Sequence, residues 1–351
     1  MLILVTLVPF LAILIVTSLS CCCIRTVRHR RARTRTEKEL EETRKAFTIR
    51  TPEIEMISRL DEDCPGGYGQ VHKATYRDWT VAVKQLQLVM VEWDDVRREF
   101  LREIQFMRTV RHPNIVMFIG AGQYNKDQPF LVLEYMGGGA LCSLLHKKEV
   151  ELCAKQKLRF VLEAAKGMDY LHTLKPPRIH RDLKSANLLL SLNWQVKVAD
   201  FGSARLIPQP DQARATKDKR FQKQSNTDEE KDSKQLLDEC SYLTSKHIGT
   251  ARWRSPEVWK NMSYGTPTDV YSFAIVVWEI LTREIPFSGS KYKFDAQVEC
   301  DVLAGIRPPT PNDACKIFRK LMEECWQHKP EARPQFTSIV SRLESMHCKD
   351  Q

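Results

Sequence analysis

The chain has 351 residues and 42% hydrophobic content, which is enough for a substantial buried core and excludes a mainly disordered protein. Its formal net charge of +10 is concentrated in one segment, because residues 25–45 carry nine Lys or Arg against four Glu. No basic stripe interleaved with aromatic residues occurs elsewhere, so we expect no nucleic-acid partner. The eleven cysteines include no CxxC pair, which argues against a zinc site and is typical of a reducing compartment.

Residues 1–24 contain no charged side chain, and a helix of this length reaches about 36 Å, enough to cross a bilayer core of about 30 Å. The pattern predicts a transmembrane helix. A secretory signal peptide is the alternative, but it would have a basic start and a shorter apolar stretch. The three cysteines at residues 21–23 are candidates for palmitoylation, with no role of their own as the alternative.

Residues 25–52 are predicted to form a basic juxtamembrane linker. Six arginines lie between Arg25 and Arg35, and such a cluster beside a membrane helix favours contact with anionic lipid. By the positive-inside rule it also places everything downstream in the cytoplasm. We therefore expect a single-pass membrane protein whose folded part faces the cytoplasm.

The folded part is predicted to begin near Glu53. Short apolar or alternating runs predict strands over Gln70–Tyr76, Thr80–Leu86, Val116–Gly120 and Phe130–Tyr135. After Met136 the periodicity turns helical, with an amphipathic helix over Lys157–Leu174 and a buried, almost wholly apolar helix over Val270–Leu281. Strands first and helices second predict two lobes. The polar residues 208–240 are expected to form a disordered insertion.

Glu103 lies on the apolar side of a predicted helix over 91–110. It comes three residues after Phe100 and four before Met107, so it faces the core with them. A buried carboxylate needs a cation, and its own helix offers none at neighbouring positions. The alternating strand Val81-Ala82-Val83-Lys84 supplies one, because Lys84 faces the side opposite to Val83.

The segment from Ile179 to Leu190 reads IHRDLKSANLLL, and VADFG follows at Val198 to Gly202. In the order VAVK, Glu, HRDxxxxN, DFG and SPE, these segments resemble the eukaryotic protein kinases. The resemblance covers residues 53–347. It implies an α+β bilobal fold with an antiparallel sheet and the family's C helix in an N-lobe over 53–135, and a helical C-lobe over 137–347.

The resemblance implies ATP and Mg²⁺ as cofactors. Phosphoryl transfer mainly requires positioning and charge neutralisation, which cations and metal-bound carboxylates provide. Lys84 would hold the α- and β-phosphates and be oriented by Glu103, while Asp200 and Asn187 would be the metal ligands.

Asp182 would accept the proton of a substrate hydroxyl or orient that hydroxyl, and Lys184 would contact the γ-phosphate. The alternative for Asp182 is that it only caps a turn. The resemblance also implies nucleotide contacts from Gly66, Gly67, Gly69, Val71, Ala82, Lys84, the gatekeeper Leu133, Glu134, Met136 and Leu189.

The phosphate-covering loop departs from the family pattern GxGxxGxV, because Cys64 to Val71 reads CPGGYGQV. Cys64 replaces the first glycine and Pro65 stiffens the loop. The acidic residues 61–63 precede it, and acidic groups beside phosphates are unfavourable. We expect weakened ATP affinity, and a membrane-tethered pseudokinase scaffold is the alternative function.

The expected substrates are Ser or Thr hydroxyls of proteins, because Lys184-Ser185-Ala186 replaces the AAR or RAA typical of tyrosine kinases; a dual-specificity kinase is an alternative. Gly249 to Glu257 resembles the GTxxWxxPE segment of the tyrosine-kinase-like group, in which Thr250 commonly bonds the catalytic Asp and Lys. The same resemblance implies a buried ion pair between Glu257 and Arg333.

The activation segment is predicted to span residues 200–257. Arg181 is the residue that receives an activation-loop phosphate in many kinases. Phosphorylation by an upstream activating kinase is therefore expected to order the segment. The candidate acceptors are Ser241, Tyr242, Thr244 and Ser245.

Overall fold

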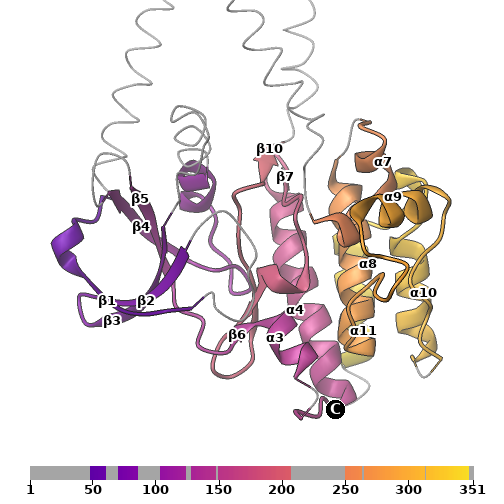
Figure 1. Ribbon diagram of the computed structural model, residues 1–351, viewed down its shortest axis with the longest axis horizontal. Coiled ribbons are helices and arrows are strands. Elements are labelled where there is room, and N and C mark those ends of the chain that lie inside the picture. Colours follow the sequence, from indigo (N-terminus) through magenta and orange to yellow (C-terminus); the bar gives the residue numbers. More distant parts are fainter. Residues whose placement is uncertain are drawn as a thin grey trace, which may run out of the picture.

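The computed structural model describes residues 48–60, 70–85, 103–123, 128–147, 149–206, 250–262, 265–312 and 314–347. Figure 1 shows a β-sheet on one side of the molecule and a helical assembly on the other. This is the bilobal kinase fold, with an antiparallel N-lobe sheet and a helical C-lobe, that the resemblance implies. The expected transmembrane helix, the insertion over 208–240 and the expected linker up to residue 47 lie outside the described residues.

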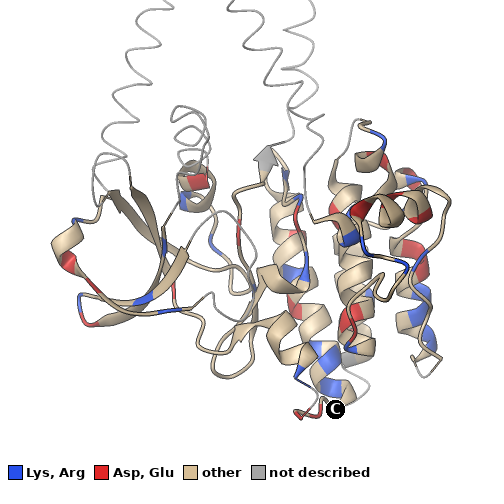
Figure 2. Cartoon of the chain, viewed as in Figure 1, with Lys and Arg blue, Asp and Glu red and all other residues tan. Residues whose placement is uncertain are grey.

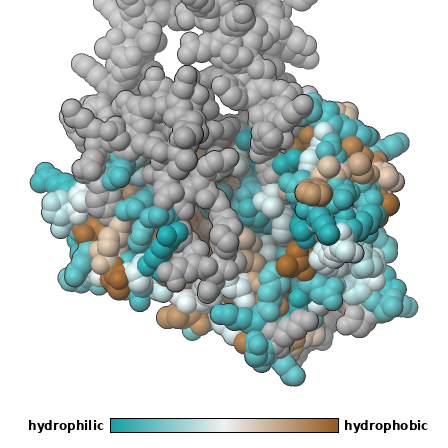
Figure 3. Space-filling view, in the orientation of Figure 1, coloured by the Kyte–Doolittle hydropathy of each residue, from teal (hydrophilic) through white to brown (hydrophobic). Residues whose placement is uncertain are grey.

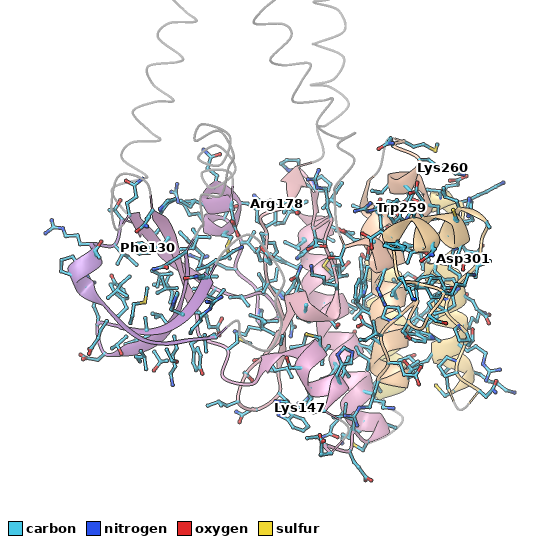
Figure 4. All side chains as sticks on the ribbon, in the orientation of Figure 1. Phe130, Lys147, Arg178, Trp259, Lys260 and Asp301 are labelled. Carbon is cyan, nitrogen blue, oxygen red and sulfur yellow. The ribbon has the colours of Figure 1, made fainter. Side chains whose placement is uncertain are left out.

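The N-lobe is a five-stranded antiparallel sheet in the order β1-β2-β3-β5-β4. The strands are β1 (Ile54–Arg59), β2 (Gln70–Tyr76), β3 (Trp79–Gln85), β4 (Phe118–Gln123) and β5 (Pro129–Glu134). Alternation along β3 buries Val81 and Val83 completely, in a cluster with Phe130 and Val132 of β5. Phe130 is labelled among the sheet side chains in Figure 4.

The turn between β2 and β3 consists of Arg77 and Asp78, both with positive φ, at 46° and 66°. Two such residues form the tight hairpin whose twist matches the flanking strands. The pairing Tyr76↔Trp79 follows directly, and it fixes the register that brings Val71 opposite Lys84.

The folded part begins earlier than the boundary predicted at Glu53. Thr48 forms a parallel bridge with Ala121 of β4, and the Ile49 amide donates to the Ala121 carbonyl at 2.8 Å. Ile49 is also buried in the sheet's apolar cluster. The prediction used polarity alone, and a polar segment can still add its backbone to the exposed edge of a sheet.

The C-lobe is built around α8 (Thr266–Thr282), which is buried on every side from Thr268 to Ile280. Pro267 in its first turn has no amide hydrogen to leave unpaired. The longer α4 (Ala154–Thr173) and α11 (Phe336–His347) lie beside it in Figure 1. The remaining helices are α3 (Leu141–His146), α7 (Pro256–Trp259), α9 (Asp295–Leu303) and α10 (Lys316–Cys325).

Short strands and 3₁₀ turns carry the segments between the lobes. They are β6 (Gly139–Ala140), β7 (Arg178–Ile179), β8 (Leu188–Leu190), β9 (Val196–Val198), β10 (Arg205–Leu206), η2 (Ser185–Asn187) and η4 (Ala251–Trp253). β6, β8 and β9 form one sheet, and β7 pairs with β10. These pairings fix both ends of the segment that contains the HRD and DFG sequences.

The buried character predicted for Val270–Leu281 is confirmed by α8. In the described part of the chain, no helix is both long and apolar enough to span a bilayer. Acidic and basic residues are interspersed over both lobes in the part drawn in Figure 2. On the face shown in Figure 3, hydrophobic residues lie singly or in small groups among hydrophilic ones on the helical lobe.

Candidate active site

Lys84 on β3 lies between two carboxylates. Its Nζ is 2.7 Å from Asp200 Oδ1 and 3.3 Å from Glu103 Oε1. The alternation of β3 places Lys84 on the side opposite to Val83, and residues 103–108 are helical with Glu103 only 6% exposed. The structure thus brings a strand, a helix and the DFG segment together on one ammonium group.

The charges of this cluster depend on one another. The positive charge of Lys84 is the main cause that lowers the pKa of Asp200, to about 2. Burial alone would lower the pKa of Lys84, but the carboxylates of Asp200 and Glu103 outweigh it and raise that pKa. Lys84 and Asp200 therefore remain ionised at neutral pH. Asp200 also has a left-handed backbone, with φ at 61°, a conformation that is uncommon for a non-glycine residue.

Asp182 lies in a second cluster. The cluster is formed by residues 180–187, which contain the HRD sequence and are called the catalytic loop below, and by the segment that begins at Thr250. Its Oδ1 accepts hydrogen bonds from the Thr250 amide at 2.9 Å and hydroxyl at 3.1 Å. Its Oδ2 lies 3.0 Å from Lys184 Nζ and 3.1 Å from Asn187 Nδ2. Lys184 Nζ in turn donates to Thr250 Oγ1 at 2.6 Å. The bonds of Thr250 to both charged residues, which the resemblance implies, are present.

Asp269, in the first turn of α8, accepts hydrogen bonds from the backbone of the catalytic loop. The fully buried Asp269 accepts the backbone amides of His180 at 2.9 Å and Arg181 at 2.8 Å, and lies 2.8 Å from His172 Nε2. The His180 ring lies 2.9 Å from the Ala199 carbonyl. The apolar pattern predicted this helix from Val270 onward, and it assigned no role to Asp269. An acidic residue in an otherwise apolar helix was the signal that could have indicated more.

The expected adenine contacts gather around one small apolar cluster. Val116, Met136 and Ala199 are buried together, with Leu133 and Leu189 packed against them. Ala82 is paired with Leu133 across the sheet. Ala82 and Lys84 lie two positions apart on β3 and therefore on the same face, so this apolar cluster lies on the side of the sheet that carries Lys84.

Glu134 differs from the rest of this set. Its amide donates to the Met117 carbonyl at 2.9 Å, so that donor is occupied. Its side chain accepts the Met117 amide at 3.1 Å and contacts Lys197 Nζ at 2.5 Å. The carboxylate of Glu134 therefore braces the segment before β4 and strand β9. Of the other expected nucleotide contacts, Gly66, Gly67 and Gly69 lie outside the described residues.

Two oxygen atoms are suited to a divalent cation. Asn187 uses its Nδ2 to donate to the Asp182 carbonyl and carboxylate, which leaves its Oδ1 facing away from these partners. Asp200 uses Oδ1 for Lys84 and has its Oδ2 outside that bond. Amide and carboxylate oxygens are the ligands that Mg²⁺ prefers, and it commonly takes only one or two protein groups together with phosphate oxygens. The residues present therefore fit Mg²⁺ bound with a nucleotide.

Among the described residues, no group of three or more His, Cys, Asp or Glu forms a metal site.

Comparison with known proteins places this site in a family. The model of the protein kinase domain matches residues 65–343. The probable serine/threonine-protein kinase drkC of Dictyostelium discoideum is 35% identical over 86% of this chain and 36% of its own length. The serine/threonine-protein kinase STY17 of Arabidopsis thaliana is 36% identical over 80% of this chain and 43% of its own length. The chain thus spans less than half of these curated relatives, and it belongs to the protein kinase domain family.

Proposed function

We propose that the protein is an active Ser/Thr protein kinase that transfers the terminal phosphoryl group of ATP to protein hydroxyls. The observation that carries the proposal is the pair of adjacent clusters, Lys84 with two carboxylates and Asp182 with Lys184 and Thr250. The first suits the binding of phosphates and the second the positioning of a hydroxyl. The relatives described above, which are named as a probable serine/threonine-protein kinase and a serine/threonine-protein kinase, support the same reaction.

Asp182 is the proposed base. A substrate hydroxyl at Asp182 would give its proton to a carboxylate oxygen as it attacks the γ-phosphorus of ATP. The bond from that phosphorus to the bridging oxygen would break and release ADP, and Lys184 would balance the charge on the transferred group. Lys84 would hold the remaining phosphates, in the position that Glu103 and Asp200 give it. When bound, Mg²⁺ neutralises phosphate oxygens, and Asn187 and Asp200 would hold it.

The nucleotide base would lie against the apolar cluster of Leu133, Met136 and Leu189, beneath Ala82 and Val71 of the sheet. The support is their common location beside Lys84 and their apolar surface. Gly66, Gly67 and Gly69 remain proposed phosphate contacts on the sequence pattern alone.

The reaction is tested with the full-length chain, Mg²⁺ and ATP labelled at the γ-phosphate, with a general protein substrate and analysis of the phosphorylated amino acids. We expect phosphoserine and phosphothreonine. In Asp182→Asn the base is lost while the shape is kept, so turnover should fall by about 10²-fold or more, the usual contribution of general base catalysis. Asp169→Asn is the matched control. The Asp169 carboxylate accepts a hydrogen bond from the Thr337 hydroxyl at 2.7 Å on the surface, and this bond involves neither Lys84 nor Asp182.

The second candidate is the pseudokinase scaffold, which the altered loop at residues 64–71 favours. It predicts that the wild type and Asp182→Asn show the same turnover. Phosphotyrosine among the products would instead indicate the dual-specificity alternative.

We also propose that the chain is anchored in a membrane by residues 1–24, with the kinase domain in the cytoplasm. The support is the charge-free stretch followed by six arginines. Translation in the presence of microsomes, followed by alkaline extraction, is the test. The full chain should stay with the membrane and remain accessible to added protease, whereas removal of residues 1–24 should release it. Extraction of the full chain at high pH would contradict the anchor.

Activation by phosphorylation remains a proposal. Arg181 now donates from Nε to the Ser203 carbonyl at 2.5 Å, so its side chain lies at the start of the segment that an upstream kinase would modify. Alanine at Ser241, Tyr242, Thr244 and Ser245 together should abolish any activation by such a kinase. Unchanged activation would contradict this role.

A further inference from the structure

A carboxyl group that the proposed chemistry does not use lies near the C-terminal end of α8. Glu279 is 1% exposed, and its neighbours in the helix are apolar. A buried carboxyl is unfavourable unless its oxygens are hydrogen-bonded. An apolar side chain at this position would fill the core at lower cost in free energy. The hydrogen-bond partners of Glu279 therefore indicate what role the carboxyl group has.

Each oxygen of Glu279 bonds a different segment. Oε1 lies 2.7 Å from Ser185 Oγ, at the start of η2 and next to Lys184. Oε2 accepts the indole N–H of Trp253 at 2.7 Å, at the end of η4 and three residues after Thr250. One rigid helix thus holds the catalytic loop with one atom and the segment after Thr250 with another.

These are the same two segments that meet at Asp182. Thr250 bonds Asp182 and Lys184 at the reactive end, and Glu279 joins Ser185 and Trp253 behind it. Two connections fix the separation and the relative rotation of two segments, where one would leave a hinge. Loss of the rear connection would let Thr250 and Asp182 move apart.

The charge state of Glu279 suits this role. Burial raises the pKa of Glu279 to about 8, so at neutral pH the group is mostly the uncharged acid. Ser185 Oγ donates to Oε1 and the Trp253 indole N–H donates to Oε2, and these hydrogen bonds oppose the effect of burial on the pKa without cancelling it. The nearby charged side chains on both segments bond elsewhere: Lys184 bonds Thr250 and Asp182, and Arg252 bonds the Pro286 and Phe287 carbonyls.

We propose that Glu279 is a positioning residue for phosphoryl transfer to protein, which fixes the segment that an acceptor must contact against the loop that carries Asp182. The inference rests on the proposed kinase function. It assigns no contact with ATP to Glu279. Loss of Glu279 should therefore lower kcat/KM for the protein substrate and leave the KM for ATP nearly unchanged.

The test compares four variants of the full chain by steady-state kinetics with a protein substrate. Glu279→Ala removes both bonds, Trp253→Phe removes one, and Glu279→Gln keeps an acceptor and a donor in the same places. Trp278→Phe is the matched control, because it also removes a 2.7 Å indole bond from α8, but to the Pro309 carbonyl on the other side. A loss of stability alone would affect Trp253→Phe and Trp278→Phe alike.

We expect Glu279→Ala and Trp253→Phe to lower kcat/KM for the protein substrate by about tenfold or more, the effect of about 1.4 kcal/mol in the transition state. The KM for ATP should change by less than about twofold, and Glu279→Gln and Trp278→Phe should keep the wild-type kinetics at pH 7. Equal losses in Trp253→Phe and Trp278→Phe, or a loss in Glu279→Ala that only matches its unfolded fraction, would overturn the proposal.

Amide hydrogen exchange separates this inference from the proposed function. In Glu279→Ala, exchange should rise at residues 183–187 and 250–254 together, and in Trp278→Phe at neither. If the wild type showed no turnover above Asp182→Asn, the kinase function would fail, but the exchange result would still decide whether Glu279 couples the two segments. Unchanged exchange in both segments would rule the coupling out.

Discussion

Arg333 and Glu257 form a buried ion pair in the C-lobe. Two guanidinium bonds of 2.7 and 2.8 Å join side chains that are 0% and 4% exposed. Burial opposes ionisation of Glu257, but Arg333 outweighs it and keeps the pKa of the carboxyl below its ordinary value. The pair that the family resemblance implied is therefore confirmed, and both its members are charged.

Arg333→Met should be strongly destabilising, because it leaves a charged carboxylate in the core without a partner. The expected loss is about 3–5 kcal/mol in the free energy of unfolding. Urea unfolding of the full chain measures it. Arg342→Met is the control, since its pair with Glu324 is 45% and 30% exposed and should contribute at most about 1 kcal/mol. Similar losses in both variants would show that the buried pair has no special role.

Glu279 predicts a pH dependence of stability. Its pKa in the folded protein is about 8, above the 4.5 of the unfolded chain. Between these values the folded state holds a proton that the unfolded chain has lost. The stability due to Glu279 is therefore complete below about pH 4.5 and decreases as the pH rises towards 8, with a slope of about 1.4 kcal/mol per pH unit.

The measurement is the difference in unfolding free energy between the wild type and Glu279→Gln from pH 6 to 7.5. That difference should shift by about 2 kcal/mol in favour of the Gln variant, because the amide does not titrate. Glu344→Gln, at a half-exposed ion pair, controls for the removal of one carboxyl. A difference that stays constant with pH would mean that Glu279 is already ionised at pH 6.

The contact between Lys84 and Glu103 was predicted from two short segments, and the structure confirms it. Lys84 and Glu103 could be paired because one is a cation on an alternating strand and the other a carboxylate on an apolar face. Asp269 and Glu279 were missed as parts of the site, because their partners are backbone amides and neutral side chains far along the chain. No spacing rule in a single sequence reports such contacts.

Arg283 connects the end of α8 with the end of α3. It ends α8 in a left-handed conformation, with φ at 59°. Its guanidinium donates to the carbonyls of Leu144, Leu145, Lys147 and Val150, at and just beyond the end of α3. Lys147 is labelled at that end in Figure 4. A cation there also compensates the partial negative charge of the α3 carboxyl end.

Arg283→Gly separates the two functions of this residue. Glycine adopts positive φ without strain and would stabilise a plain helix end. The hydrogen bonds of the charged group are worth about 1.5–3 kcal/mol, so we expect net destabilisation of about 1–2 kcal/mol in urea unfolding. Asn261→Gly is the matched control, with φ at 52° on an exposed residue, and should be neutral or stabilising. Stabilisation by both substitutions would show that the hydrogen bonds of the Arg283 guanidinium group add nothing to stability.

Several elements could be predicted, and the strand of the N-lobe sheet that was missed has a physical reason. β2 has the predicted bounds, and β3, β5 and α4 differ by only a few residues. β1 was not predicted, because the pairing shifts between Met56 and Ser58 and most of its side chains are exposed. A bulge interrupts the period-two pattern on which a strand prediction depends.

At the scale of the whole molecule, α8 connects the parts of the proposed site. Asp269 at one end holds the HRD backbone, Glu279 near the other holds Ser185 and Trp253, and Arg333 reaches the same helix through the Pro267 carbonyl at 2.9 Å. The order of motifs along the chain was sufficient to predict the fold. The bonds that set the positions of those motifs required the three-dimensional arrangement.

The proposed membrane attachment of this domain is based on two sequence features, and they can be tested separately. Without residues 1–24, the six arginines between Arg25 and Arg35 should still attract anionic lipid, at about 1 kcal/mol for each residue near the surface. The truncated chain should therefore bind vesicles that contain phosphatidylserine and not neutral vesicles. Replacement of the six arginines by glutamine is the matched control, and it should remove this binding while leaving the folded domain unchanged.

Salt provides the decisive measurement in vesicle sedimentation. Raising the ionic strength from about 0.1 M to about 1 M shortens the screening length from about 10 Å to about 3 Å, so an electrostatic attachment should be lost. The full chain should remain on the vesicles at both salt concentrations, because burial of an apolar helix does not depend on charge. Loss of the full chain at high salt would show that the arginines alone hold it and that residues 1–24 do not enter the bilayer.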